Sequence, residues 1–257
     1  MNLKDVKAVV TGGASGLGEA CVRMIAENGG KAAIFDLPMQ KERADKLIAE
    51  LGAGVVFCGT DVTNEESVLA SVAKAVDAFR GINVAINCAG VGDPAKLLSK
   101  KGPMPLAFFN RVVQINLVGT FNVIRLAVEQ MVKNEAGKDG EKGVVINTAS
   151  AAAFDGQVGQ PAYSASKAGV VGMTLPLARE CADYGVRVMT IAPGLFNTPM
   201  LAILPQAARD ALGAMVPFPR RLGDPSEFAM LCKQIIENPM LNGEVIRLDG
   251  SIRMAAK

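Results

Sequence analysis

The sequence predicts an α/β fold, with a doubly wound parallel sheet of about seven strands and helices on both of its faces. Short apolar runs rich in β-branched residues alternate along the chain with segments of helical period. The first run leads through a glycine-rich turn into a helix, which is the order that opens a β-α-β unit. No repeat, low-complexity run or linker divides the 257 residues. We therefore expect residues 1–257 to form a single domain with strand order 3-2-1-4-5-6-7.

Helical patterns separate the expected strands, and the two longest of them cover 106–132 and 161–183. Residues 91–105 have no periodicity, so we expect a long substrate loop near the active end of the sheet. Residues 199–216 are apolar with breaks, which suggests a small helical flap. The expected strands are Val6–Thr11, Lys31–Asp36, Val55–Gly59, Asn83–Asn87, Val144–Thr148, Val186–Ala192 and Val245–Leu248.

Composition removes several function classes. The net charge is +2 with dispersed charges, which gives no reason to expect nucleic acid or an anionic membrane as a partner. The chain has no histidine, which excludes histidine-based nucleophile systems and histidine-ligated zinc. Its five cysteines are scattered and lack a C-x2-C pair, so we expect reduced thiols and no metal site. An apolar run begins almost at Met1 and none reaches the ~18 residues of a membrane span, so we expect a cytoplasmic protein.

The stretch from Thr11 to Gly18 predicts a dinucleotide site. It reads Thr-Gly-Gly-Ala-Ser-Gly-Leu-Gly, follows an expected strand and opens a helix. The glycines allow the backbone to approach a pyrophosphate, and the helix N-terminus offers N–H groups to it. Asp36 ends the next strand, eighteen positions after Gly18. A carboxylate there can bind both ribose hydroxyls and would repel a 2′-phosphate, so the sequence favours NAD over NADP.

Further residues follow later strands at the same edge of the expected sheet. Asp61 and Val62 follow the third strand, where a cofactor edge is expected, although turn and helix-cap chemistry explains Asp61 equally well. Cys88-Ala89-Gly90 follows the fourth strand as a small-residue turn that lets a flat group pack closely. Lysines at 96, 100 and 101 in the loop 91–105 either are simply solvated or meet an anionic substrate group.

Tyr163 and Lys167 are the candidate acid/base pair. A spacing of four places two side chains on one face of a helix. A nearby ammonium favours the phenolate and is expected to lower the phenol pKa. Ser150, at the end of an expected strand, can hold a substrate oxygen beside that phenol. A surface lysine beside a half-buried tyrosine would show the same spacing. The other motifs of the chain are therefore needed to distinguish an acid/base pair from such a surface pair.

Asn116 falls within the apolar stripe of the long helix. A buried polar residue there needs a partner, since an unpaired one costs about 1–3 kcal/mol. We interpret it as a bend that frees a backbone carbonyl to hold water.

The order and spacing of these motifs resemble the short-chain dehydrogenase/reductase family over nearly the whole chain. The resemblance implies a Rossmann-like fold. Where the family often has Asn-Asn-Ala-Gly, this chain has Cys88 in the second position. That change, with the stretches 119–125, 154–160 and 238–249, resembles the branch of type-2 3-hydroxyacyl-CoA dehydrogenases, also described as short-chain 17-beta-hydroxysteroid dehydrogenases. Asn197 departs from the glycine common in that branch, which puts the flap geometry in doubt.

The resemblance also implies residue roles. Ser150, Tyr163 and Lys167 would be catalytic, with Asn116 completing a water-mediated proton relay, and Gln157 and Gln160 would line the substrate pocket with Ser150 and Tyr163. Cofactor binding would fall to Gly12, Ser15, Gly16, Leu17, Gly18, Asp36, Asp61, Val62, Cys88, Ala89, Gly90, Tyr163, Lys167, Pro193, Phe196 and Thr198.

We therefore expect an NAD-dependent enzyme of lipid metabolism that interconverts 3-hydroxyacyl-CoA and 3-ketoacyl-CoA. A dehydrogenase of hydroxysteroids or other bulky secondary alcohols is the alternative within enzymes, because the apolar flap would accept either substrate. A non-catalytic NAD-binding scaffold is the alternative from another class, and the complete set of Ser150, Tyr163, Lys167 and Asn116 argues against it. By analogy with the family we expect a homotetramer with helices 106–132 and 161–183 at an interface. Thick internal packing would explain the same apolar faces.

Overall fold

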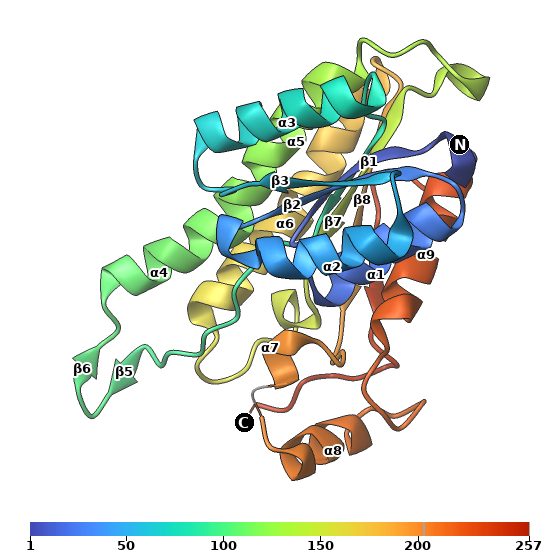
Figure 1. The fold of residues 1–257 in the computed structure, drawn as a ribbon. Coiled ribbons are helices and arrows are strands. Elements are labelled where there is room, and N and C mark those ends of the chain that lie inside the picture. The colour runs from blue at the N-terminus through green and yellow to red at the C-terminus, as the bar shows by residue number, and fades with distance from the viewer. Residues whose placement is uncertain (203, 257) are drawn as a thin grey trace.

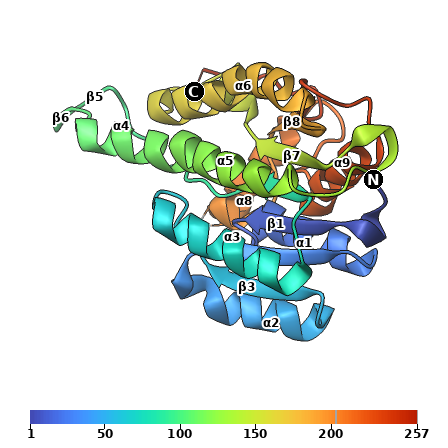
Figure 2. The same cartoon turned by 90° about the horizontal axis from the view of Figure 1, so that it is seen from above.

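Residues 1–202 and 204–256 are described by a computed structural model, in which a parallel sheet of seven strands lies between two layers of helices (Figures 1 and 2). Its order, β3-β2-β1-β4-β7-β8-β9, is the predicted 3-2-1-4-5-6-7 when these strands are counted along the chain, so the predicted fold class is confirmed. Residue 203 of the predicted flap and residue 257 of the predicted domain lie outside the described residues. The strands are β1 (Lys7–Thr11), β2 (Lys31–Asp36), β3 (Val55–Gly59), β4 (Val84–Asn87), β7 (Gly143–Thr148), β8 (Val186–Pro193) and β9 (Val245–Leu248).

Each face of the sheet has its own hydrophobic core, because successive side chains of a strand point to opposite faces. On β1, Ala8 and Val10 enter the first core and Val9 enters the second, and all three are fully buried. The first core is covered by α1 (Gly16–Glu27), α2 (Lys41–Leu51) and α9 (Pro225–Glu237). The second is covered by α3 (Glu65–Phe79), α5 (Gly119–Met131) and α6 (Pro161–Ala182).

The carboxyl ends of the strands meet at the edge where the predicted site residues lie. Thr11 at the end of β1 is in register with Phe35 on one side and with Asn87 on the other. The chain winds toward β2 and β3 on the first side and toward β4 on the second, which makes this the topological switch point. Ligands of open α/β sheets bind outside the strand ends at such a point.

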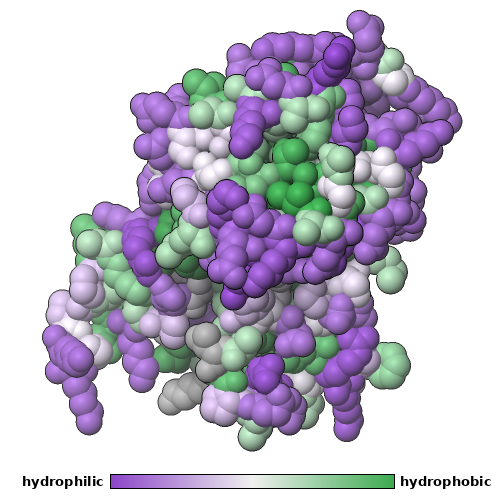
Figure 3. Space-filling view, in the orientation of Figure 1, coloured by the Kyte–Doolittle hydropathy of each residue, from purple (hydrophilic) through white to green (hydrophobic). Residues whose placement is uncertain are grey.

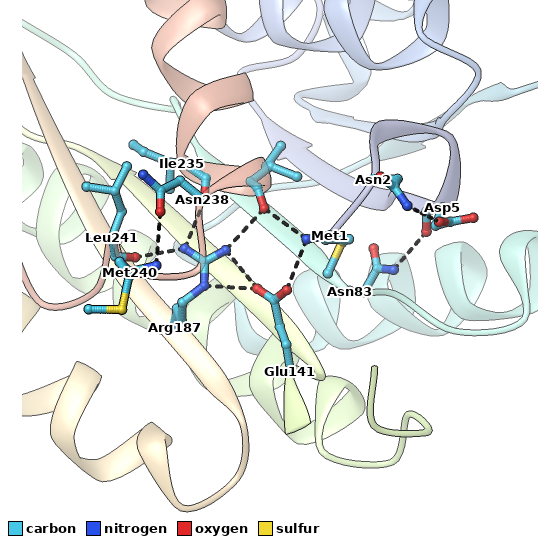
Figure 4. Close-up of polar contacts among 11 residues, drawn as sticks. Met1, Asn2, Asp5, Asn83, Glu141, Arg187, Ile235, Asn238, Met240 and Leu241 are labelled. Carbon is cyan, nitrogen blue, oxygen red and sulfur yellow. Dashed lines mark hydrogen bonds and ion pairs between the residues drawn. The ribbon is translucent and has the colours of Figure 1, made fainter. Parts of the chain in front are cut away.

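The opposite edge is closed by a buried ion pair (Figure 4). Arg187, near the start of β8, is 7% exposed and donates to one Glu141 oxygen at 2.7 and 2.9 Å. Its other donors reach the carbonyl groups of Ile235, Ile236 and Leu241 at 2.7–3.2 Å. All five guanidinium donors are therefore paired, which is the condition under which a buried arginine is tolerated. These contacts join β8 to α9 at the edge of the sheet opposite the predicted site residues.

The long predicted helix 106–132 is divided into two. α4 (Leu106–Val113) and α5 are separated by a π-helical turn, Gln114–Val118, which contains Asn116. Such turns occur frequently at functional sites. Among the described residues one helical run, Leu106–Met131, is apolar and long enough to cross a membrane, and 50% of its apolar window is buried, as in a core helix. The face seen in the space-filling view is largely hydrophilic, with its hydrophobic patches broken up by polar side chains (Figure 3).

The loop 91–105 projects from the body and carries a short hairpin, which the sequence did not predict (Figure 1). Its strands are β5 (Leu98–Ser99) and β6 (Gly102–Pro103). The described part of the predicted flap is helical as expected, with α7 (Pro199–Ala202) and α8 (Gln206–Ala214).

Candidate active site

The glycine-rich turn after β1 is shaped by close contacts of the backbone. Gly12 has a φ of +63°, and a Cβ there would lie 3.0 Å from the amide nitrogen of Ala89. A Cβ on Gly18 would lie only 2.3 Å from the carbonyl oxygen of Gly12. The turn runs into the N-terminus of α1 after Ser15, where N–H groups attract phosphate. A turn that has no room for a Cβ at Gly12 or Gly18 and ends at a helix N-terminus fits a pyrophosphate.

Asp36 ends β2 beside this turn. Its Oδ2 accepts a hydrogen bond from the amide of Ala14 at 3.0 Å, and its Oδ1 accepts one from the amide of Leu37 at 2.9 Å. Desolvation raises the pKa of the carboxyl above its ordinary value, and the two backbone bonds and the charge of Arg43 act against that rise. Each carboxylate oxygen can accept a second bond. Asp36 can therefore hold the turn and still accept bonds from ribose hydroxyls.

Asp61 and Val62 form a tight turn after β3. Asp61 Oδ1 accepts from the backbone N–H and the hydroxyl of Thr63 at 2.9 and 2.7 Å, which is the turn chemistry that the sequence left open. Val62 packs against Gly119, where a Cβ would lie 2.7 Å from Val62 Cγ2. Its carbonyl accepts from Asn122 Nδ2 at 3.0 Å. Asn122 is buried and was missed by the sequence reasoning, although a polar residue in an apolar helix was the signal.

Residues 88–90 connect the glycine turn to the candidate acid/base pair. Thr11 Oγ1 accepts from the amides of Cys88 and Ala89, each at 3.1 Å, and so joins the ends of β1 and β4. A Cβ on Gly90 would lie 3.1 Å from Asn116 Oδ1 and 3.5 Å from Lys167 Nζ. Three segments that are far apart in the sequence therefore meet at Gly90.

Ser150, Tyr163 and Lys167 come from two neighbouring elements. Ser150 follows β7 and caps a 3-10 turn, Ala151–Ala153, by accepting from the amide of Ala152 at 3.1 Å. Tyr163 and Lys167 lie on α6, and Lys167 Nζ is 5.9 Å from the centre of the Tyr163 ring. Lys167 is buried and donates to the Thr148 carbonyl at 2.8 Å. The structure thus brings together the lysine, the phenol and the serine hydroxyl.

The expected lowering of the Tyr163 pKa is wrong for the chain by itself. Desolvation raises the pKa of Tyr163, and hydrogen bonding with the Ser150 side chain opposes that rise without reversing it. Desolvation also lowers the pKa of Lys167 to about 8. The physical reason is that both groups sit away from water, so each is driven toward its neutral form. The phenol is therefore protonated at neutral pH and suited to donating a proton.

Asn116 joins the π-helical turn to the start of the loop 91–105. Its Oδ1 accepts from the Val91 amide at 2.8 Å, and its Nδ2 donates to the Val91 carbonyl at 2.9 Å and to Ser166 Oγ at 3.0 Å. The buried amide thus has the partners that its position requires. Its own carbonyl accepts from the Thr120 hydroxyl at 2.8 Å, so the carbonyl interpreted as free for water already has one partner. A carbonyl has two lone pairs, so the Asn116 carbonyl can still accept a hydrogen bond from a water molecule. The proposed role of this carbonyl in a water-mediated proton relay stays a prediction.

The loop 91–105 and the segment 154–160 face each other across a hollow of about 490 Å³. The amide of Ala95 donates to the carbonyl of Gly159 at 2.7 Å and holds the two walls together. The predicted pocket residues Gln157 and Gln160 line this hollow, whereas Ser150 and Tyr163 are not among its lining residues. Pro161 and Ser164 flank Tyr163 and do line it. The lining residues are Lys96, Leu97, Leu98, Gly156, Gln157, Val158, Gly159, Gln160, Pro161 and Ser164.

The start of the flap closes against both halves of the site. A Cβ on Gly16 would lie 3.2 Å from Pro199 Cδ and 3.5 Å from Thr198 Cβ, so Thr198 lies beside the glycine turn. A Cβ on Gly92 would lie 2.8 Å from Met200 Sδ, which places the flap over the root of the loop 91–105. Pro193 ends β8 at the same edge of the sheet. Phe196 is buried, and its ring packs against Gly223.

A sheet with this switch point, a glycine turn and a Tyr-Lys pair beside it defines the class of dinucleotide-dependent oxidoreductases. Comparison with known proteins agrees, because the family model described as "short chain dehydrogenase" matches residues 6–208. The chain belongs to the short-chain dehydrogenase family. Cys88, which departs from a common family motif, lies within the matched region.

Individual relatives narrow the comparison. The human protein named 3-hydroxyacyl-CoA dehydrogenase type-2 is 53% identical over 98% of this chain and 97% of its own. A crystal structure of 3-hydroxyacyl-CoA dehydrogenase type-2 from Mycobacterium avium superposes with a TM-score of 0.92 at 40% identity, over 97% of this chain and 96% of that one. The 3-ketoacyl-(acyl-carrier-protein) reductase from Brucella melitensis, solved in complex with NADH, has a TM-score of 0.85 at 26% identity, over 97% and 98%.

Proposed function

We propose that this oxidoreductase uses NAD to interconvert 3-hydroxyacyl-CoA and 3-ketoacyl-CoA. The observation that carries the proposal is the meeting of the glycine turn, Asp36 and the Ser150, Tyr163, Lys167 group at one edge of the sheet. Relatives that match nearly the whole chain bear the corresponding name, and one structural neighbour was solved with NADH.

The residues of the chain supply binding and proton transfer. A bound nicotinamide dinucleotide accepts or donates the hydride. Tyr163, whose pKa is raised, donates its phenol proton to the developing alkoxide during reduction of the ketone. During oxidation it receives the hydroxyl proton, and Lys167, an ammonium below its pKa of about 8, favours the phenolate that this requires. Ser150 holds the same substrate oxygen by a hydrogen bond.

The position of Asp36 supports NAD rather than NADP as the cofactor. The carboxylate lies next to the glycine turn, with both oxygens turned toward backbone amides and one lone pair left on each. A ribose 2′-hydroxyl can donate to such an oxygen, whereas a 2′-phosphate would meet a negative charge.

A CoA thioester suits the surroundings of the hollow. Leu97, Leu98 and Val158 offer apolar contact, and Lys96 lies among them. Lys100 and Lys101 lie exposed on the same hairpin. A cationic group such as Lys96 fits an anionic phosphate better than it fits a steroid, which is uncharged. The hydroxysteroid alternative is favoured only by the apolar lining.

The test is the oxidation of NADH and of NADPH by the purified protein with acetoacetyl-CoA and with a steroid ketone. We expect turnover with NADH and acetoacetyl-CoA, and a kcat/KM at least tenfold lower for NADPH. Equal or faster turnover of the steroid ketone would move the assignment to a hydroxysteroid dehydrogenase. Tight NADH binding with no turnover of either ketone would support the scaffold alternative.

Assembly and location are part of the same proposal. The exposed Leu106, Val118 and Phe121 on the run 106–131 and Leu175 on α6 are the kind of surface that a homotetramer would cover. Light scattering tests this, and a monomer would contradict it. The cytoplasmic location is a prediction that cell fractionation tests.

A further inference from the structure

One side of the hollow is lined by residues 156–160, which belong to the segment 154–160 between the two candidate catalytic residues Ser150 and Tyr163. Its residues are absent from the two main hydrophobic cores, so packing against the sheet does not hold it. Side chains and backbone from the C-terminal part of the chain hold it instead.

Arg247 on β9 is the centre of these contacts. Its guanidinium pairs with Asp155 at 2.6 Å and with Asp249 at 2.7 Å, and it lies over the ring of Phe154 at 5.1 Å. It also donates to the Ile252 carbonyl at 3.1 Å. One arginine therefore contacts the two residues that lead into the lining residues 156–160, and two residues of the segment that follows β9.

The segment 251–256 completes the attachment. The carbonyl of Ala255 accepts from Gln157 Nε2 at 2.9 Å, and the carbonyl of Ala256 accepts from the Val158 amide at 3.0 Å. Gln157 and Val158 both line the hollow. The segment is itself anchored by Ile252, which is buried.

We propose that Arg247, acting through Asp155 and the segment 251–256, sets the width of the hollow and thereby determines which substrate chains the site accepts. Arg247 is a positioning residue, because its guanidinium is paired with carboxylates rather than aimed at the site. The proposal rests on the proposed function, since the chain in the hollow is taken to be that of an acyl-CoA.

Arg253 provides a matched control. It belongs to the same charge cluster, but its side chain is 62% exposed and its contacts with Asp249 and Asp155 are longer, at 3.3 and 4.0 Å. Arg247 is only 21% exposed. Removing either arginine takes away one positive charge, so a difference between the two variants reports position and not net charge.

The experiment compares Arg247→Gln, Asp155→Asn, their double variant and Arg253→Gln. We expect KM for acetoacetyl-CoA to rise at least fivefold in each Arg247 and Asp155 variant, and to rise no further in the double variant. The ratio of kcat/KM for 3-ketodecanoyl-CoA to that for acetoacetyl-CoA should change at least threefold. The Kd of NADH and all values for Arg253→Gln should stay within twofold, which also shows that the variants are folded.

Hydrogen exchange of the Val158 amide is the second readout and needs no substrate. We expect it to accelerate in Arg247→Gln and Asp155→Asn and to be unchanged in Arg253→Gln. Faster exchange with an unchanged KM and chain-length ratio would make the contacts merely structural and overturn the proposal. Unchanged exchange would overturn it as well. If the wild type turned over no acyl-CoA, the proposed function would fail, and so would the part of this proposal that concerns substrate chains. Hydrogen exchange of the Val158 amide would still show whether Arg247 holds the segment 154–160 in place.

Discussion

The cofactor side and the substrate side of the carboxyl edge are built by different means. The cofactor side consists of strand ends and tight turns, held by contacts such as the hydrogen bonds that the amides of Cys88 and Ala89 donate to the Thr11 hydroxyl. The substrate side consists of the loop 91–105, the segment 154–160 and the flap, held by contacts such as those of Asn116 and Arg247. On the cofactor side, a larger side chain would collide with neighbouring backbone. On the substrate side, a substitution would instead shift a loop that borders the hollow. The first side should therefore tolerate few substitutions, and the second should adapt to different substrates.

Gly18→Ala should produce the largest effect on the rigid side. The new Cβ would lie 2.3 Å from the Gly12 carbonyl oxygen, and overpacking of this kind costs about 1–3 kcal/mol. We expect the Kd of NADH, measured by fluorescence titration, to rise at least tenfold. Gly172→Ala on α6 is the control, because nothing lies within 4 Å of its Cβ, and it should leave the Kd unchanged. Equal effects of the two variants would contradict the close-contact explanation.

Asp36→Ala tests the charge on the same side. Loss of the carboxylate removes a ribose acceptor and the repulsion of a 2′-phosphate, so the NADH to NADPH ratio of kcat/KM should fall by about tenfold, or ~1.4 kcal/mol. Asp45→Ala is the control, because Asp45 is exposed on α2 and paired with Lys41. A ratio that does not move would show that Asp36 only holds the turn.

Lys167→Met tests the buried lysine where the two sides meet. The pKa of Lys167 is about 8 when folded and 10.5 when exposed, so the unfolded chain binds its proton more tightly. The resulting destabilisation is fully present below pH 8 and is relieved as the pH rises toward 10.5. Its size is on the order of 3 kcal/mol at most. Urea unfolding of the cofactor-free proteins should show the wild type gaining stability relative to the variant across this window, and a constant difference would contradict the lowered pKa.

Lys100→Gln with Lys101→Gln should produce the smallest effect, on the adaptable side. Both lysines are exposed, and exposed charge pairs contribute about 0–1 kcal/mol. We expect KM for acetoacetyl-CoA to rise two- to fivefold at low salt and to approach the wild-type value at high salt. No change at low salt would show that these lysines are simply solvated.

The same contrast explains what the sequence could predict. The individual strands, the glycine turn and the Tyr163 to Lys167 spacing depend on local patterns, and the α/β fold class was confirmed. The hairpin in the loop 91–105 was not predicted because that loop has no periodicity. The contact of Arg247 with Asp155 joins residues 92 positions apart, so no local pattern indicated it. The Tyr163 pKa was predicted in the wrong direction because burial cannot be read from a spacing of four residues.

The most direct test of the central claim is a single measurement on Tyr163→Phe. NADH is bound first, acetoacetyl-CoA is added, and the loss of NADH fluorescence is followed in a stopped-flow instrument. The account predicts a Kd for NADH within threefold of wild type. It also predicts a hydride-transfer rate that is lower by about 10²- to 10⁴-fold, the usual contribution of a general acid. A wild-type rate would show that Tyr163 does not supply the proton, and the assignment of the site would be wrong.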